Sequence, residues 1–165
     1  MTDAAPTPAP KQISLQRIYL KDASVEVPLA PQVFTRQWQP QIDVQVGTNT
    51  TPLGDDLFQV MLSVTVTAKQ GSDVGFLVEV HQGGIFQLAG FAAGEPEQQA
   101  ILAGYCPGVI FPFARETVAD LVQRTGFPPV LLQPINFEAL YIEHLARQRA
   151  QGAAAIGGAD GATVQ

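Results

Sequence analysis

The stretch LFQVMLSVTVTA, residues 57–68, alternates apolar and polar side chains over most of its length. Successive side chains of a β-strand point to opposite faces, so this alternation predicts a strand with one packed face and one solvated face. The apolar set comprises Phe58, Val60, Leu62, Val64, Val66 and Ala68, and the polar set comprises Gln59, Ser63, Thr65 and Thr67.

Three further segments carry the same alternation, and turn-rich linkers at residues 47–56 (GTNTTPLGDD) and 69–73 (KQGSD) separate them. In residues 41–46 the apolar residues are Ile42, Val44 and Val46; in residues 73–81 they are Val74, Phe76, Val78 and Val80, opposite Leu77, Glu79 and His81. In residues 13–27, Ile13, Leu15, Tyr19, Val25 and Val27 share one parity, which Ile18 and Leu20 break. Four such strands predict an antiparallel sheet with one face covered.

The second half of the chain has helical periodicity. Apolar residues recur at helical spacing from Pro112, which suits a first helical turn, to Gly126, which ends the helix. Asn136 is a good N-cap for a second helix, with an apolar stripe from Phe137 to Leu145. Strands followed by helices predict an α+β fold, a four-stranded antiparallel sheet with two main helices packed on one face.

One domain is expected between residues 11 and 150. Residues 1–10 and 151–165 are rich in small residues and proline or glycine, so we expect them to be flexible tails. Acidic residues outnumber Lys and Arg by 15 to 9, which argues against nucleic acid as a partner. The N-terminus lacks the features of a signal peptide and no apolar run is long enough to span a bilayer, so a cytoplasmic protein without membrane insertion is expected.

The residues that usually carry chemistry are sparse. Glu79 and His81 lie two positions apart on a predicted strand, about 7 Å from each other, which is typical of a solvated strand face rather than of a catalytic pair. His81 and His144 are not spaced as metal ligands, and the lone Cys106 is expected to be packed rather than reactive. The sequence therefore predicts no enzyme activity, no metal site and no cofactor. Gly83 and Gly84 are expected to mark a bulge or bend.

Two connectors are unusually apolar. Residues 126–135, GFPPVLLQPI, hold three prolines and five large apolar residues, and residues 30–40 hold Phe34 and the only tryptophan, Trp38. Connectors of this length are normally polar. Either these segments pack on the chain's own sheet, or they form a wall of an apolar cleft for a ligand or partner.

Six motifs in order give the chain a specific resemblance. They are RIYLKDASVEVPLAPQVF (17–34), WQP (38–40), VTVTA (64–68), FLVEVHQGGIF (76–86), YCPGVIFPFARE (105–116) and PINFEALY (134–141). Together they resemble the SecB family of bacterial protein-export chaperones over residues 12–148. The resemblance implies a SecB-like fold, an assembly as a homotetramer that is a dimer of dimers, and binding of unfolded preproteins that are then delivered to the SecA motor without ATP.

The resemblance also implies which residues form the binding sites. The zinc-bearing C-terminal tail of SecA would bind Asp22, Glu26, Leu77 and Glu79, all on the outward parity of their predicted strands. The client peptide would bind in a hydrophobic groove mapped onto Trp38, Phe127, Val130, Leu131 and Leu132. Ile18 and Leu20, which break the parity of the first strand, are the expected subunit contacts. The alternative is a structural or oligomeric interaction protein that binds no client.

Overall fold

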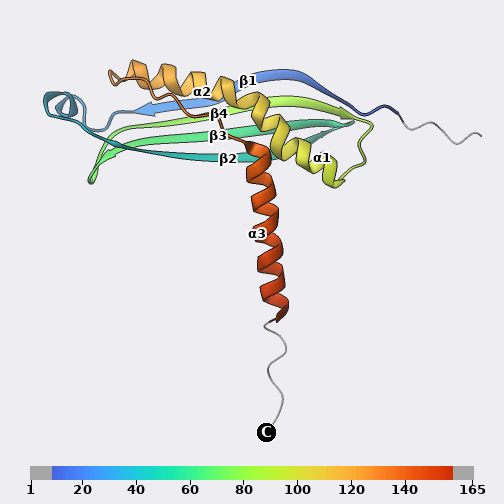
Figure 1. Cartoon of the computed structure of the whole chain (residues 1–165). Coiled ribbons are helices and arrows are strands. Elements are labelled where there is room, and N and C mark those ends of the chain that lie inside the picture. The colour runs from blue at the N-terminus through green and yellow to red at the C-terminus, as the bar shows by residue number, and fades with distance from the viewer. Residues whose placement is uncertain (1–8, 158–165) are drawn as a thin grey trace, which may run out of the picture.

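A four-stranded antiparallel sheet organises the chain, as seen in a computed structural model that describes residues 9–157 (Figure 1). Its strands are β1 (Gln12–Glu26), β2 (Gln41–Gly54), β3 (Leu57–Gln70) and β4 (Asp73–Ala89), in the spatial order β1-β4-β3-β2. A short 3-10 turn, η1 (Gln32–Thr35), interrupts the connector between β1 and β2. The helices follow β4: α1 (Pro96–Ala100), a π-helical turn η2 (Ile101–Tyr105), α2 (Cys106–Arg124) and α3 (Phe137–Gly157). The predicted α+β fold is confirmed.

The two faces of the sheet differ in cover. On β3 and β4 the apolar residues predicted to point inward are almost all fully buried, and α2 packs on them. The alternation of these central strands therefore predicted their orientation correctly. We call this side the helix-covered face and the other the open face. The fully buried side chains of the helix-covered face include Val60, Leu62, Val64, Val66, Phe76, Val78, Val80, Phe86 and Leu88.

The first strand departs from simple alternation because it contains two β-bulges. The pairing of β1 with β4 shifts between Leu15 and Arg17 and again between Leu20 and Asp22. Directly paired residues share a face, so Ile18 opposite Gly84 lies on the helix-covered face, as does Leu20 opposite Gln82, while Tyr19 opposite Gly83 lies on the open face. Grouping Tyr19 with the inward residues was wrong, because each bulge reverses the parity that follows it.

The glycine pair of β4 does not mark a bulge in that strand, which was one of the two features expected there. β4 pairs with β3 in unbroken register from Leu57 to Ala68, and the irregularities lie in β1 instead. A Cβ atom at Gly83 would lie 2.4 Å from the Tyr19 ring, and one at Gly84 would lie 2.9 Å from Ile110. These glycines make room for side chains packed against the strand on its two faces.

The residues 47–56 were expected to form a linker, yet β2 continues to Gly54. Thr48, Asn49 and Thr50 pair with β3, and the turn is confined to Asp55 and Asp56, which adopt positive φ angles. Pairing with a long partner strand supplies the backbone hydrogen bonds that these turn-prone residues would otherwise seek locally.

The first long helix begins earlier than predicted. Pro107, rather than Pro112, occupies the first turn of α2, and Pro112 lies inside the helix. An internal proline removes a hydrogen bond to the carbonyl four residues earlier, here that of Gly108. Gly108 is exposed and has open space around its Cα, so water can satisfy this carbonyl.

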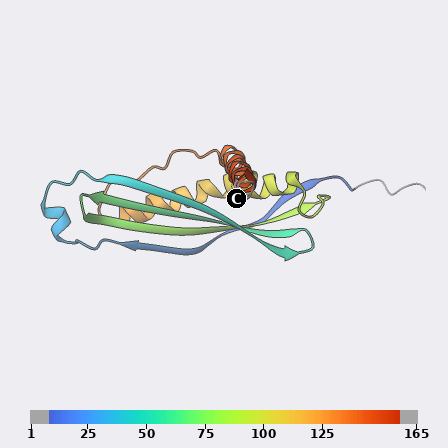
Figure 2. The same cartoon turned by 90° about the horizontal axis from the view of Figure 1, so that it is seen from below.

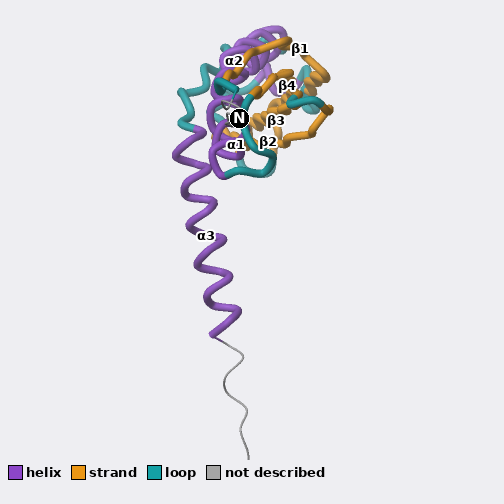
Figure 3. Tube along the Cα trace, turned by 90° about the vertical axis from the view of Figure 1, so that its right-hand side faces the viewer, coloured by secondary structure: helices purple, strands orange, loops and turns teal. Residues whose placement is uncertain are grey.

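The last helix starts on the helix-covered face and then leaves the domain (Figure 3). The Asn136 side chain accepts a hydrogen bond from the backbone N–H of Ala139 at 3.0 Å, which confirms the predicted N-cap. Phe137 is buried, whereas Leu140 and Ile142 are 48% and 66% exposed. Figure 2 looks nearly along the axis of α3. The helix extends to Gly157, into the expected C-terminal tail; the rest of that tail and most of the N-terminal one lie outside the described residues.

Candidate binding surfaces

The four residues predicted to bind SecA lie together on the open face. In the pairing of β1 with β4, Glu26 lies opposite Leu77 and Ser24 lies opposite Glu79. Asp22 lies opposite His81, the next open-face residue of β4. Neighbouring strands are about 4.8 Å apart and alternate residues of one strand about 7 Å, so the set extends about 13 Å along the strands, from Asp22 to Glu26, and lies on two adjacent strands. We call Asp22, Glu26, Leu77 and Glu79 the acidic face.

The carboxylates of the acidic face are available to a partner. Within residues 9–157, none of Asp22, Glu26 and Glu79 forms an ion pair with a lysine or arginine. All three are exposed, and Leu77 is half-buried between them. A cavity of about 400 Å³ opens beside Leu77 and Glu26 and is lined also by Pro28 and Leu29. The surface thus offers negative charge around an apolar recess.

A further carboxylate joins this surface across the sheet. Leu77 pairs with Thr67, and Thr67 pairs with Asp43 of β2, so Asp43 lies in the same row as Glu26. Its side chain accepts a hydrogen bond from Gln45 at 3.2 Å. Asp43 alternates with Ile42 and Val44, so strand parity places it on the opposite face from them, but its place in the row depends on the strand order, which no local pattern reveals.

The histidine of the open face is engaged across the strands. His81 Nδ1 and the Ser63 hydroxyl lie 2.8 Å apart in a hydrogen bond between β4 and β3. No hydrogen bond joins Glu79 to His81 among the described residues, so the two do not form a coupled pair.

The cysteine lies in the buried core. Burial raises the pKa of the Cys106 thiol to about 12, which keeps it protonated at neutral pH.

The residues predicted to bind clients fall into two neighbouring sites. Trp38 and Phe127 belong to an aromatic cluster with Phe34 and Phe76, in which the Phe127 ring centroid lies 6.1 Å from that of Trp38. Phe127 is only 9% exposed, so its ring fills the cluster. A Cβ atom at Gly75 would lie 2.3 Å from the Trp38 ring, which shows how closely the indole lies against β4.

The second site is an open apolar groove along the edge of the sheet. Val130, Leu131 and Leu132 line a cavity of about 550 Å³ together with side chains of β2. Leu131 is 73% exposed, whereas Leu132 is buried in the core. Ile42 and Val44, which the sequence pattern placed on the packed face, are 42% and 40% exposed. The lining of this groove is Ile42, Val44, Val46 and residues 130–135.

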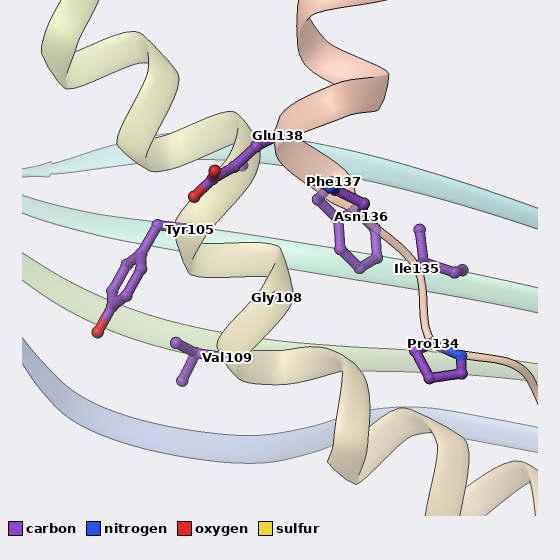
Figure 4. A pocket seen from close by; sticks show the side chains of 9 residues that line it. Tyr105, Gly108, Val109, Pro134, Ile135, Asn136, Phe137 and Glu138 are labelled. Atoms are coloured by element: carbon purple, nitrogen blue, oxygen red, sulfur yellow. The ribbon is translucent and has the colours of Figure 1, made fainter.

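Another cavity lies where the last helix joins the body of the domain (Figure 4). Its volume is about 480 Å³, and its walls come from η2, α2 and the start of α3. Tyr105 and Val109 stand on one side and Pro134 and Ile135 on the other. Gly104 allows this close crossing, since a Cβ atom there would lie 2.8 Å from the Glu138 side chain.

None of the described helices has an apolar stretch long enough to cross a bilayer. Within the same residues, no group of three or more His, Cys, Asp or Glu side chains could hold a metal ion.

Comparison with known proteins identifies the family. The family model described as preprotein translocase subunit SecB matches residues 6–148. The protein-export protein SecB of Thioalkalivibrio sulfidiphilus is 49% identical over 158 residues, covering 91% of this chain and 92% of its own. That of Chromobacterium violaceum is 52% identical over 139 residues, covering 84% and 91%.

Among solved structures, a SecB-like chaperone of Mycobacterium tuberculosis, in complex with a peptide from an antitoxin, superposes with a TM-score of 0.58 at 20% identity and covers 74% of this chain and 87% of its own. At 20% identity this likeness supports the fold alone. The family model and the relatives at 49% and 52% identity assign the family. The chain therefore belongs to the SecB family of protein-export proteins.

Proposed function

We propose that this chain is an ATP-independent chaperone that binds unfolded preproteins in its apolar groove and delivers them to SecA. One observation carries the proposal: the exposed apolar groove and the acidic face lie on opposite faces of the same sheet. A client in the groove and a basic partner attracted by the acidic face could therefore bind at the same time without competing for surface. The SecB-like structure solved with a peptide supports this assignment by analogy of fold.

Client binding would rest on burial of apolar area. Such burial contributes roughly 25 cal/mol per Å² and has no preferred direction, so a groove lined by Ile42, Val44 and Leu131 accepts many sequences that are unfolded. Folded proteins are excluded because their apolar side chains are already buried. No nucleotide or metal is needed for such a cycle of binding and release.

Docking to SecA would rest on charge. The exposed carboxylates of Asp22, Glu26 and Glu79 suit a basic segment around the zinc of SecA's C-terminal tail, with the Leu77 side chain as an apolar contact. Attraction between exposed charges weakens with salt, since the screening length falls to about 8 Å at physiological ionic strength. Binding in the groove would be much less sensitive to salt.

The working form we propose is a homotetramer, a dimer of dimers, acting in the cytoplasm. Ile18 and Leu20 are the proposed subunit contacts. Leu20 is 48% exposed on the helix-covered face of the edge strand β1. Several grooves on one assembly would let a single long client bind at successive sites, which raises overall affinity through effective concentration.

The proposal is tested by separating the two bindings. Leu77→Arg places a positive charge within the acidic face, so we expect binding of the SecA tail to fall by more than tenfold while an unfolded preprotein is still held soluble at stoichiometric ratio. Ile85→Arg is the matched control, because Ile85 lies on the same strand and the same face but eight positions away.

Isothermal titration with the zinc-loaded SecA tail and light scattering of a refolding preprotein are the two measurements. Equal weakening by Leu77→Arg and Ile85→Arg would contradict the placement of the docking site. A wild-type chain that suppresses no aggregation and binds no unfolded chain would favour the alternative, an oligomer with a structural role only.

A further inference from the structure

Phe127 occupies the centre of the aromatic cluster although it comes from a connector. Its ring centroid lies 5.0 Å from that of Phe34, 5.4 Å from that of Phe76 and 6.1 Å from that of Trp38. The other three rings come from β4 and from the connector between β1 and β2, so they would enclose a ring-sized space without Phe127.

The backbone around Phe127 is held weakly. Gly126 has a φ of +91°, which turns the chain inward, and Pro128 and Pro129 cannot donate hydrogen bonds. Among the described residues, no backbone–backbone hydrogen bond involves residues 127–135. The N–H of Phe127 has only a long contact of 3.4 Å to the Thr125 hydroxyl. The connector is therefore held mainly by its apolar side chains. Moving it away from the sheet would break side-chain contacts but almost no backbone hydrogen bonds.

A buried donor in the same cluster has no acceptor. Trp38 Nε1 is inaccessible to solvent and forms no hydrogen bond among the described residues, and it is the only such side-chain atom there. A buried donor without a partner is unfavourable, and most buried indole N–H groups have an acceptor. An acceptor brought by a ligand would remove this penalty.

We propose that Phe127 is a resident substitute for a client's aromatic side chain. This inference rests on the proposed function. It adds that a phenylalanine or tyrosine ring of the client replaces the Phe127 ring between Phe34, Phe76 and Trp38. Trp38 Nε1–H then donates to a backbone carbonyl of the client beside that ring. Phe127 competes with the client, so the apparent affinity equals the intrinsic affinity multiplied by the fraction of time that the Phe127 ring leaves the site empty.

Truncating Phe127 tests whether a client ring replaces its ring, because the direction of the change in client affinity separates two roles for this side chain. A side chain that lines a site weakens binding when it is removed, whereas a competing occupant strengthens it. We therefore expect Phe127→Ala to bind a dye-labelled unfolded peptide containing one phenylalanine about tenfold more tightly than wild type, by fluorescence anisotropy. Leu131→Ala is the matched control from the same connector, and we expect weaker binding because Leu131 lines the open groove. Unchanged or weaker binding by Phe127→Ala would overturn the inference.

The peptide supplies a second control. Replacing its phenylalanine by leucine removes the ring that fits the cluster, so the gain from Phe127→Ala is expected to shrink to less than about threefold. Trp38→Phe in the Phe127→Ala background keeps a ring but removes the N–H, and we expect it to lose several-fold affinity for the phenylalanine peptide. Full retention of affinity would overturn the role of Nε1.

Folding of the variant is controlled separately. If Phe127→Ala unfolds, Phe127→Leu keeps apolar bulk without the ring, and its affinity for the phenylalanine peptide is expected to exceed that of wild type. Failure of the wild type to bind either peptide would defeat the proposed function and this inference with it. Binding by wild type together with weaker binding by both Phe127 variants would defeat this inference alone.

Discussion

The two faces of this sheet are built from the same strands but differ in cover and in charge. On the helix-covered face, Val78 and Val80 are fully buried, and the apolar surface continues uncovered onto β2 as the groove. On the open face, Glu79 lies between them in sequence and is exposed. A strand with a two-residue period thus provides, within three residues, part of a buried core and part of an exposed charged surface.

The comparison predicts that stability and the proposed docking to SecA can be altered independently. Side chains of the helix-covered face contribute through area removed from water, which salt affects little. The exposed carboxylates of the open face contribute little to stability, because exposed charges are worth about 0–1 kcal/mol each. Substitutions on one face are therefore expected to leave the property governed by the other unchanged.

The largest contrast is expected between adjacent residues of β4. Val78→Asp places a carboxylate in a site with no exposure, and we expect it to lower the free energy of unfolding by more than about 3 kcal/mol. Glu79→Ala is expected to change it by less than about 0.5 kcal/mol. Urea unfolding followed by circular dichroism measures both. Similar losses for the two variants would show that the faces are not independent.

A smaller effect is expected where the helix-covered face reaches the edge strand. Replacing Ile18 and Leu20 together with serine removes apolar contact area proposed to lie between subunits, and we expect the proposed tetramer to dissociate at least tenfold more readily. Native mass measured by light scattering across a dilution series reports this change. Arg17→Ser, on the open face of the same strand, is the control. A native mass unaffected by the double replacement would remove Ile18 and Leu20 from the interface.

The smallest expected effect is a pH dependence that comes from the buried core. Burial raises the pKa of the Cys106 thiol from 9.0 to about 12, so above pH 9 the unfolded chain releases a proton that the folded chain retains. The stability from this group is complete below pH 9 and declines as pH rises toward 12, by about 1.4 kcal/mol at pH 10.

Cys106→Ala removes this titration. Its free energy of unfolding is expected to fall less steeply than that of wild type between pH 9 and pH 10, as measured by urea unfolding at each pH. Other groups titrate equally in both proteins, so the difference between the curves isolates the thiol. Parallel curves would mean that Cys106 is not dry in the folded protein.

Several features could be predicted from local patterns. The alternation of residues 57–68 and 74–80 fixed which side chains are buried, because a two-residue period is a property of each strand by itself. Asn136 identified the start of the last helix, since its side chain caps the adjacent N–H groups. The outward parity of Asp22, Glu26, Leu77 and Glu79 was also correct, because the two bulges of β1 cancel before Asp22.

Other features depend on which segments meet in space. The positions of Ile18, Leu20 and Tyr19 follow from bulges that only the pairing of β1 with β4 defines. The role of Gly83 follows from the Tyr19 ring above it, and the place of Asp43 in the acidic row follows from the strand order. None of these contacts is local in sequence, so no window of neighbouring residues contains them.

The sequence by itself determined the α+β class, the buried face of the central strands and, through its motifs, membership of the SecB family. The tertiary structure alone decided that Phe127 fills the aromatic cluster while Leu131, four residues later, stands exposed beside the groove. Both are large apolar residues of one proline-rich connector, so composition cannot separate them. Burial depends on which strands the connector crosses, and that is settled only when distant segments pack together.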